Sequence, residues 1–283
     1  APLALAVILN VAPFWLRTLR WGHLLGGICD VGVLQRLRAI AIGFMLNNVL
    51  PARAGEIGRA YALPGRDKLP LAIFATIVLE RLFDTAAIGA LFLLAVWQLD
   101  PATITTGEQN GLAAVRNAAT GFAAVGLIGT GFLCLLLRHE SWLKTLLSAT
   151  ERVLPAKLQK ALEHVVCRGL EGIACLGNLR AALFAAGHSI AIWGLAVTLI
   201  IAVGKALGLP LSFPQATVIL AATCVAAALP ASPAYVGTFH FAAFSAARWF
   251  GVDAETAAAF ATILHLVMML PVTLMGGIAL MCR

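Results

Sequence analysis

Charged residues are scarce in this sequence, and their scarcity defines the class of protein. Only 12% of the residues are Asp, Glu, Lys or Arg, whereas 61% are hydrophobic and the mean hydropathy is +0.93. The apolar share of a water-soluble globular protein is nearer to about 45–50%. The composition therefore excludes a soluble globule. It predicts an all-α, polytopic membrane protein, because helices satisfy their own backbone hydrogen bonds in lipid.

Motifs for metals and nucleotides are missing as well. The cysteines are scattered and form no Cys-x-x-Cys pair, and no histidine spacing suggests zinc. We interpret them as small packing residues and expect no metal and no cofactor. No Gly-x-x-x-x-Gly-Lys-Ser/Thr loop occurs, which excludes energy supply through that nucleotide motif. The cysteines are Cys29, Cys134, Cys167, Cys175, Cys224 and Cys282.

The net charge is +7, which suits contact with anionic lipid head groups. The positive-inside rule alone would produce much of this excess, and we expect no nucleic-acid partner. The chain begins inside an apolar run and without Met. We therefore expect a short N-terminal piece, such as one helix, to precede it.

The polar residues that are present concentrate in one stretch, from Asn47 to Arg59. Charge at membrane depth needs a partner or a water-filled cavity, so this stretch predicts a functional site. Its proline and glycines interrupt a helix, and irregular backbone in a membrane is tolerated where protein or a cavity covers it. We expect two short helices, 34–50 and 55–63, that form a re-entrant hairpin. The polar side chains are Asn47, Asn48, Arg53, Glu56 and Arg59.

The apolar runs predict the membrane helices. Residues 1–16 form a first span interrupted by Asn10 and Pro13. We interpret Arg17, Arg20 and Trp21, which follow it, as an interfacial anchor. Basic residues are frequent in 138–180, which we expect to be an amphipathic cytoplasmic segment, and absent from 98–111, which we expect outside. The other spans are expected at 69–97, 112–137, 181–203 and 255–281, the last with Asp253 as its N-cap.

The span at 69–97 carries three charged side chains near its middle. On a helix, Glu80 and Asp84 share a face, and Arg81 lies on nearly the same stripe. This pattern is equally typical of an Arg81 to Asp84 ion pair that pins neighbouring helices and of direct handling of a substrate or a proton. Both interpretations stay open.

The interruption between two such short helices is called a break here. A second break, at Pro230 to His240, repeats the pattern of the first. Short helices are expected at 214–229 and 241–250, with Ser232, Tyr235, Thr238 and His240 between or near them. We expect the first hairpin to open from the cytoplasmic side and the second from the outside. Such a pair is typical of an inverted-topology repeat, with a transport site where the broken helices meet. One transmembrane domain, 1–283, would then contain repeat one (about 1–137), the segment 138–180 and repeat two (about 181–283).

Three motifs also carry a family resemblance. Leu50 to Arg59, Glu80 to Asp84 and Pro230 to Phe239, in this order, resemble the lysylphosphatidylglycerol synthase transmembrane family, also called flippase-like. The resemblance covers nearly the whole chain. It implies a lipid transporter of the bacterial cytoplasmic (inner) membrane, acting on an anionic phospholipid, a polyprenyl-linked lipid or a hopanoid-type lipid. No aminoacyl transferase domain follows in this sequence, so lipid aminoacylation is not expected.

The chemistry of the site follows from the substrate. An anionic head group crossing a bilayer needs positive charge, and Arg grips phosphate through two hydrogen bonds. We expect Arg53 and Arg59 to supply it, with helix N-termini near Gly55 and Thr238 as further donors. Carboxylates would hold the arginines when the site is empty. The expected substrate-binding residues are Asn47, Asn48, Arg53, Glu56, Arg59, Glu80, Arg81, Asp84, Ser232, Tyr235, Thr238 and His240.

The predicted function is therefore a lipid translocase that works by alternating access, not an enzyme. A carboxylate of the site, or His240, would exchange protons if a proton gradient drives it. The alternative is an integral-membrane transferase with Glu56, Glu80 or Asp84 as general base, and a third candidate is a transporter of a small water-soluble anion. The expected partner is a membrane lipid with an anionic head group. A homo-oligomer or a lipid-synthesis enzyme as protein partner stays open.

Overall fold

Helices make up nearly all of the described chain. The computed structural model describes residues 2–26, 28–50, 54–63, 70–100, 109–138, 179–228 and 233–282, and no strand occurs in these ranges. The prediction of an all-α protein is confirmed there. The long helices are α5 (Pro70–Gln98), α6 (Gln109–Arg138), α9 (Leu179–Ala206) and α12 (Ala254–Met281). The short ones are α1 (Pro2–Val11), α2 (Pro13–Leu25), α3 (Val33–Val49), α4 (Ala54–Ala62), α10 (Phe213–Ala228), η4 (Pro233–Tyr235) and α11 (Thr238–Trp249).

Three segments of the described chain are long and apolar enough to cross a membrane. They are Pro2–Leu25, Leu179–Ala206 and Ala254–Met281. Helix α5 has 29 residues, but its charged side chains interrupt the apolar run. Large hydrophobic side chains such as Ile128 are exposed on the outer faces of the helices. In water such faces would be an aggregation hazard, whereas in a bilayer they are the expected contact with lipid.

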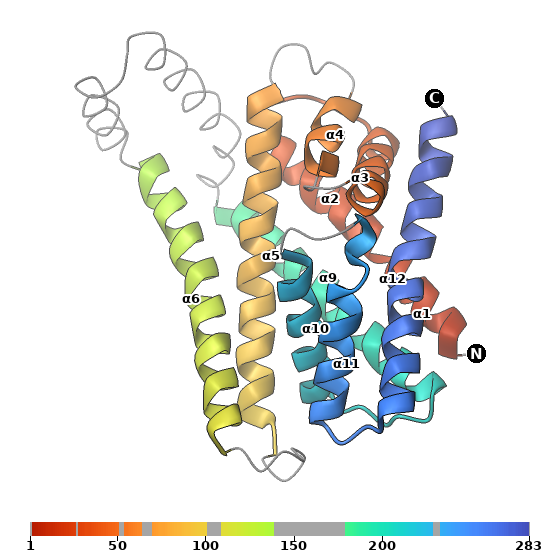
Figure 1. Ribbon diagram of the computed structural model, residues 1–283. Coiled ribbons are helices and arrows are strands. Elements are labelled where there is room, and N and C mark those ends of the chain that lie inside the picture. Colours follow the sequence, from red (N-terminus) through yellow and green to blue (C-terminus); the bar gives the residue numbers. More distant parts are fainter. Residues whose placement is uncertain are drawn as a thin grey trace, which may run out of the picture.

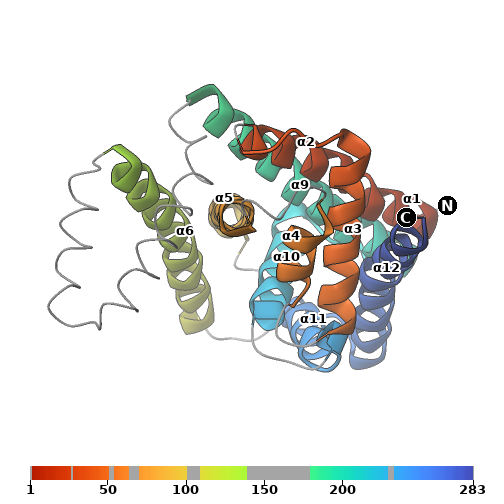
Figure 2. The ribbon, with the colours of Figure 1, turned by 90° about the horizontal axis from the view of Figure 1, so that it is seen from above.

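The helices form a bundle with one pair at its edge. Helices α5 and α6 pack side by side, and α5, seen nearly end-on in Figure 2, separates α6 from the other helices (Figures 1 and 2). Helix α9 crosses the bundle and contacts α1, α2, α5 and α10. Helix α12 packs along α3 and α11. The first broken pair, α3–α4, and the second, α10–α11, therefore both lie in the main body of the bundle.

The two helices beside the first break, α3 and α4, are tightly packed against each other. A Cβ added to Gly55 at the start of α4 would overlap the carbonyl oxygen of Gly43 on α3. Since that contact is with backbone, a side chain at Gly55 would force the two helices apart. The absence of a side chain there lets α4 fold back closely onto α3.

The second break is strained. Ala234 and Tyr235 have φ angles of 53° and 58°, in the left-handed region that non-glycine residues rarely adopt. Gly237, with φ of 92°, then redirects the chain into α11. The 3-10 turn η4, which contains Ala234 and Tyr235, contacts α3. The second break thus reaches the helix that precedes the first break.

Helix α12 contains a proline, and neighbouring side chains compensate for it. Pro271 has no N–H, which leaves the carbonyl of Val267 without its helical donor. The Nδ2 of Asn10 donates to that carbonyl oxygen at 2.8 Å and to the carbonyl of Met268 at 3.1 Å. One turn further on, Asn48 of α3 donates to the hydroxyl of Thr273 at 2.9 Å. Helices α1 and α3 therefore both hold α12 at its weakest point.

The predicted helices agree with the observed ones to within a few residues, except for the first span, predicted at 1–16, which continues through α2 to Leu25. The helix expected at 34–50 is α3, and that at 55–63 is α4. Asp253 caps α12 by accepting a hydrogen bond from the Thr256 N–H at 2.9 Å, as predicted. Residues 139–178 lie outside the described residues, so the amphipathic segment there stays a prediction.

One sequence-based interpretation was wrong. An interfacial anchor must reach the membrane surface, yet Arg20 and Trp21 have no exposed area and Arg17 is largely enclosed. They lie inside the bundle because carboxylates of α5 and aromatic rings surround them. Their partners are described next.

Candidate functional site

A buried ion-pair network joins α2, α4 and α5. The guanidinium of Arg20 binds both carboxylate oxygens of Asp84, with Nη1 at 2.5 Å from Oδ1 and Nη2 at 3.4 Å from Oδ2. It also lies 3.4 Å from Glu80, which accepts a hydrogen bond from Arg59 at 2.5 Å. Arg20 and Glu80 are fully buried, and Arg59 is 2% exposed. Paired burial of this kind is how a membrane interior tolerates ionised side chains.

Neutral side chains complete the network. The Nη1 of Arg20 also donates to the Ser189 hydroxyl at 2.5 Å, and the indole N–H of Trp193 donates to Asp84 at 3.0 Å. The guanidinium of Arg59 stacks on Trp21, with its central carbon 3.7 Å from the ring centroid. Arg20 and Arg59 therefore have their charge neutralised and their faces covered. They fix α2, α4, α5 and α9 to one another.

Two further arginines are held more loosely. The Nη1 of Arg17 lies 3.6 Å from Asp84, and Arg81 lies 3.7 Å from Asp84 and 3.8 Å from Glu56. These distances permit ion pairing but exceed a good N–H···O hydrogen bond. Buried nitrogens of both side chains, including Nη1 of Arg17 and Nη2 of Arg81, make no hydrogen bond in the described structure. Arg20 and Arg59 also have buried nitrogens without a hydrogen bond, so the longer ion-pair distances are what distinguish Arg17 and Arg81.

Both arginines contribute to the wall of a cavity. A cavity of about 210 Å³ lies between the N-terminal helices, α3, α9 and α12, and Arg17 and Arg81 are part of its wall. The amide oxygen of Asn47, also buried and without a hydrogen bond, belongs to the same wall. The lining residues are Leu9, Asn10, Pro13, Phe14, Arg17, Phe44, Asn47, Asn48, Glu56, Arg81, Ile192, Trp193, Ala196, Leu199, Tyr235, Met268, Met269 and Val272.

The charges around this cavity do not balance. The ion pairs among the described residues join four guanidinium groups, of Arg17, Arg20, Arg59 and Arg81, to three carboxylates. One positive charge is in excess, and the loosely held arginines are the ones at the cavity. Such a site is suited to one phosphate-type anion, which Arg binds through charge-assisted hydrogen bonds. The apolar part of the wall is suited to the hydrocarbon next to a head group.

The structure separates the predicted site residues into groups. Asn47, Asn48, Glu56, Arg81 and Tyr235 line the cavity. Arg59, Glu80 and Asp84 are not part of its wall and form the ion pairs behind it. Thr238 donates to the carbonyl of Tyr235 at 3.2 Å, and His240 stacks on His265. Arg53 and Ser232 lie outside the described residues. The predicted Arg81 to Asp84 ion pair is present at 3.7 Å.

Sequence reasoning missed the contribution of α2. Arg17 and Arg20 are three residues apart, so they share a helix face, just as Glu80 and Asp84 do four residues apart on α5. Two arginines and two carboxylates at matching helical spacing are complementary, and this pattern was the available signal. Trp193 and Asn10 carried no comparable signal.

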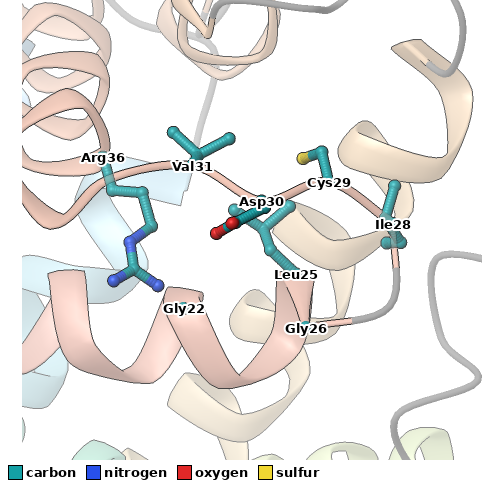
Figure 3. Close-up of a pocket in the computed structure, with 8 residues that line it drawn as sticks. All are labelled: Gly22, Leu25, Gly26, Ile28, Cys29, Asp30, Val31 and Arg36. Atoms are coloured by element: carbon teal, nitrogen blue, oxygen red, sulfur yellow. The ribbon is translucent and has the colours of Figure 1, made fainter.

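A second cavity, of about 400 Å³, lies at the end of α2 (Figure 3). The guanidinium of Arg36 extends over Gly22, where a Cβ would overlap it, and Asp30 and Cys29 form the opposite part of the wall. Arg36 and Asp30 have opposite charges, so this cavity shows no preference for an anion. Within the described ranges, no three His, Cys, Asp or Glu side chains are grouped so that they could hold a metal ion.

The fold and the site together define a multi-pass helical membrane protein with a buried ionic site beside a cavity. Residues 1–276 match the family model described as lysylphosphatidylglycerol synthase TM region, and the chain belongs to this family. The predicted resemblance is confirmed.

Among curated proteins, the chain is similar to glycosyltransferase AglD of Haloferax volcanii. The two are 28% identical over 310 aligned residues, which cover 99% of this chain. They cover 48% of the relative, so the chain spans about half of that protein's length. No solved structure matches the chain.

Proposed function

We propose that this chain is a lipid translocase that moves a lipid with an anionic head group across the membrane. The observation that carries the proposal is the pair Arg17 and Arg81, which line the cavity, are held by long ion pairs and lie where one positive charge is in excess. Two arginines would grip the phosphate. Asn47 and Tyr235 would contact the polar remainder of the head group. Hydrocarbon tails stay outside, since only the head group needs a polar path.

The architecture suggests how the site would open in turn to each face. The helices of the α3–α4 and α10–α11 pairs have at most 17 residues, fewer than the about 20 needed to span a bilayer. Each pair packs on itself and is followed by a long helix, α5 or α12. We propose that both pairs are re-entrant hairpins of an inverted repeat and that alternating access occurs where their breaks meet. Tyr235 and Asn47, from the two breaks, line the same cavity.

The family and the relative support a role with membrane lipids without identifying one. The description of the family refers to a synthase of lysylphosphatidylglycerol, a phospholipid. Anionic phospholipids, polyprenyl-linked lipids and hopanoid-type lipids all remain substrates to test. The proposed location is a cytoplasmic membrane. We expected a bacterial inner membrane, while the similar protein is archaeal.

A transferase is the second candidate, because the similar protein is named a glycosyltransferase. The carboxylate of Glu56 lines the cavity and would be its general base. Since the match covers 48% of that relative, its activity need not reside in the shared half. Under this proposal, Arg17 and Arg81 would bind the phosphate of a lipid-linked donor and would not move the lipid.

The deciding experiment is reconstitution in liposomes with head-group-labelled lipids, anionic or zwitterionic. We expect wild type to move an anionic lipid. Arg81→Gln is expected to lower the rate about tenfold or more, since a hydrogen bond to a charged group contributes about 1.5–3 kcal/mol. Arg81→Lys keeps the positive charge but loses the planar guanidinium that binds phosphate through two hydrogen bonds, so its transport rate should be intermediate. Arg248→Gln, which changes an exposed arginine on α11, is the matched control.

The same vesicles distinguish the candidates. If wild type moves no anionic lipid but forms a product from a lipid-linked sugar donor, detected by mass spectrometry, the transferase replaces the translocase. Equal transport by wild type and Arg81→Gln would refute the assignment of the head-group site.

A further inference from the structure

The second break rests on two histidines that the head-group site does not use. The Nε2 of His265, a buried residue of α12, lies 2.8 Å from the carbonyl oxygen of Ala234. A carbonyl oxygen only accepts, so Nε2 carries a hydrogen and donates. The ring of His240, in the first turn of α11, lies against the ring of His265 with centroids 4.5 Å apart. The pair connects α12 to the break.

This hydrogen bond holds a strained backbone. Ala234 and Tyr235 both have left-handed conformations, which cost a non-glycine residue about 1–2 kcal/mol each. Such strain persists only where the surroundings over-determine the conformation. The bond from His265 and the bond from Thr238 to the Tyr235 carbonyl are two side-chain restraints on this conformation. Because Tyr235 lines the cavity, these restraints also set the shape of the cavity.

The surroundings of the pair are poor in charge. Helices α1 and α10 contain no Asp, Glu, Lys, Arg or His. Arg81 of α5 faces the break across the cavity, and His188 of α9 stacks on Phe184. The remaining charged side chains of α3, α9, α11 and α12 lie within the first two turns or the last turn of their helices, namely Arg36, Arg38, Arg180, Lys205, Arg248 and Glu255. No carboxylate among them is paired with either histidine.

A proton on His240 is therefore unfavourable while the break keeps this conformation. The imidazolium would lie in the first turn of α11, at the positive end of the helix dipole, and against a second imidazole. If α11 shifts so that His240 is more exposed to water, the ring moves away from the second imidazole, and water screens the helix dipole. By linkage, protons stabilise whichever conformation binds them more tightly, which here is the shifted one.

We propose that His265 is a positioning residue of the cavity, acting through its hydrogen bond to the Ala234 carbonyl. We also propose that the His240–His265 pair makes this restraint on the second break depend on pH. The neutral pair keeps Tyr235 in the cavity wall, and proton uptake favours a released break. The held form dominates near pH 7.5 and declines toward pH 5.5 as His240 takes up a proton. The consequence for transport rests on the proposed function. The pH-dependent change at the second break does not rest on that function.

Hydrogen–deuterium exchange of the purified full chain, followed in peptides covering 233–241 and corrected for intrinsic rates, tests the step without a transport assay. We expect wild type to exchange about tenfold faster at pH 5.5 than at pH 7.5. His265→Leu, which lacks the donor, should exchange fast at both pH values. His265→Gln, which restores an N–H donor, should be protected at pH 7.5. His240→Gln should stay protected at both.

Two results would overturn the proposal. Equal protection of His265→Leu and wild type at pH 7.5 would contradict the positioning role of His265. Exchange in peptides of α5 checks that the variant is folded. An unchanged pH response in His240→Gln would remove the role of the pair. If exchange behaves as expected while wild type moves no anionic lipid in liposomes, the translocase proposal fails and the positioning role stands. Transport that follows the same pH profile supports both.

Discussion

The two breaks of this chain are held in different ways. At the first break, α4 is fixed by the Arg59 to Glu80 ion pair and by the close approach of Gly55 to Gly43. At the second, the described residues include no ion pair, and a strained backbone depends on hydrogen bonds from His265 and Thr238. An ion pair in an apolar interior is costly to separate, whereas a neutral hydrogen bond contributes about 0.5–1.5 kcal/mol. The comparison indicates a fixed first break and an adjustable second one.

The most damaging change should be removal of the Glu80 charge. Glu80→Gln leaves Arg59 unpaired and weakens the environment of Arg20, and breaking a buried pair costs about 3–5 kcal/mol. We expect a large drop in the thermal unfolding temperature in detergent. Glu255→Gln, on the exposed first turn of α12, should leave it unchanged. Equal stability of the two variants would show that the first break does not depend on its ions.

A smaller loss is expected from Gly55→Ala. The added methyl group would overlap the carbonyl oxygen of Gly43, and overpacking of this kind costs about 1–3 kcal/mol. Gly277→Ala on α12 is the control, because a Cβ there meets nothing within 4 Å. Thermal unfolding of the two variants compares them directly. Should Gly55→Ala be as stable as the control, the close packing of α3 and α4 is not what fixes the break.

The smallest effect should come from Ala234→Gly at the second break. Glycine removes the cost of a left-handed φ, while its greater freedom in the unfolded chain offsets part of the gain. We expect stability to rise slightly, by less than about 1 kcal/mol. A clear fall in the unfolding temperature would mean that the Ala234 side chain stabilises the break by packing, and strain would not be what distinguishes it.

Local sequence signals predicted most of the described fold. Prolines and glycines delimit the short helices, and the apolar runs between them predict the long ones, because both act within a few residues of the chain. The spacing of Glu80 and Asp84 located half of the ionic network. The arginines of α2, which form the other half, were wrongly predicted to be an interfacial anchor. An Arg and a Trp at the end of an apolar run give the same local pattern whether they contact lipid head groups or, as Arg20 does, a carboxylate 64 positions away. The signal for this long-range pairing was the matching spacing of charges on two helices, which is found only when the two segments are compared with each other.

The asparagines beside Pro271 have a mechanical consequence. Without other hydrogen bonds, Pro271 would make α12 a hinge. Asn10 instead donates to the carbonyl of Val267, which lacks its helical donor, and Asn48 donates to Thr273 about one turn beyond. The methyl-free Gly276 lets the same helix lie directly on the backbone of α3 at Ala41. Although α12 is encoded in the last tenth of the chain, these contacts join it to α1 and α3 from the opposite end of the sequence. A change of conformation at the second break would therefore be taken up by α10 and α11 and not by a bend of α12 at Pro271.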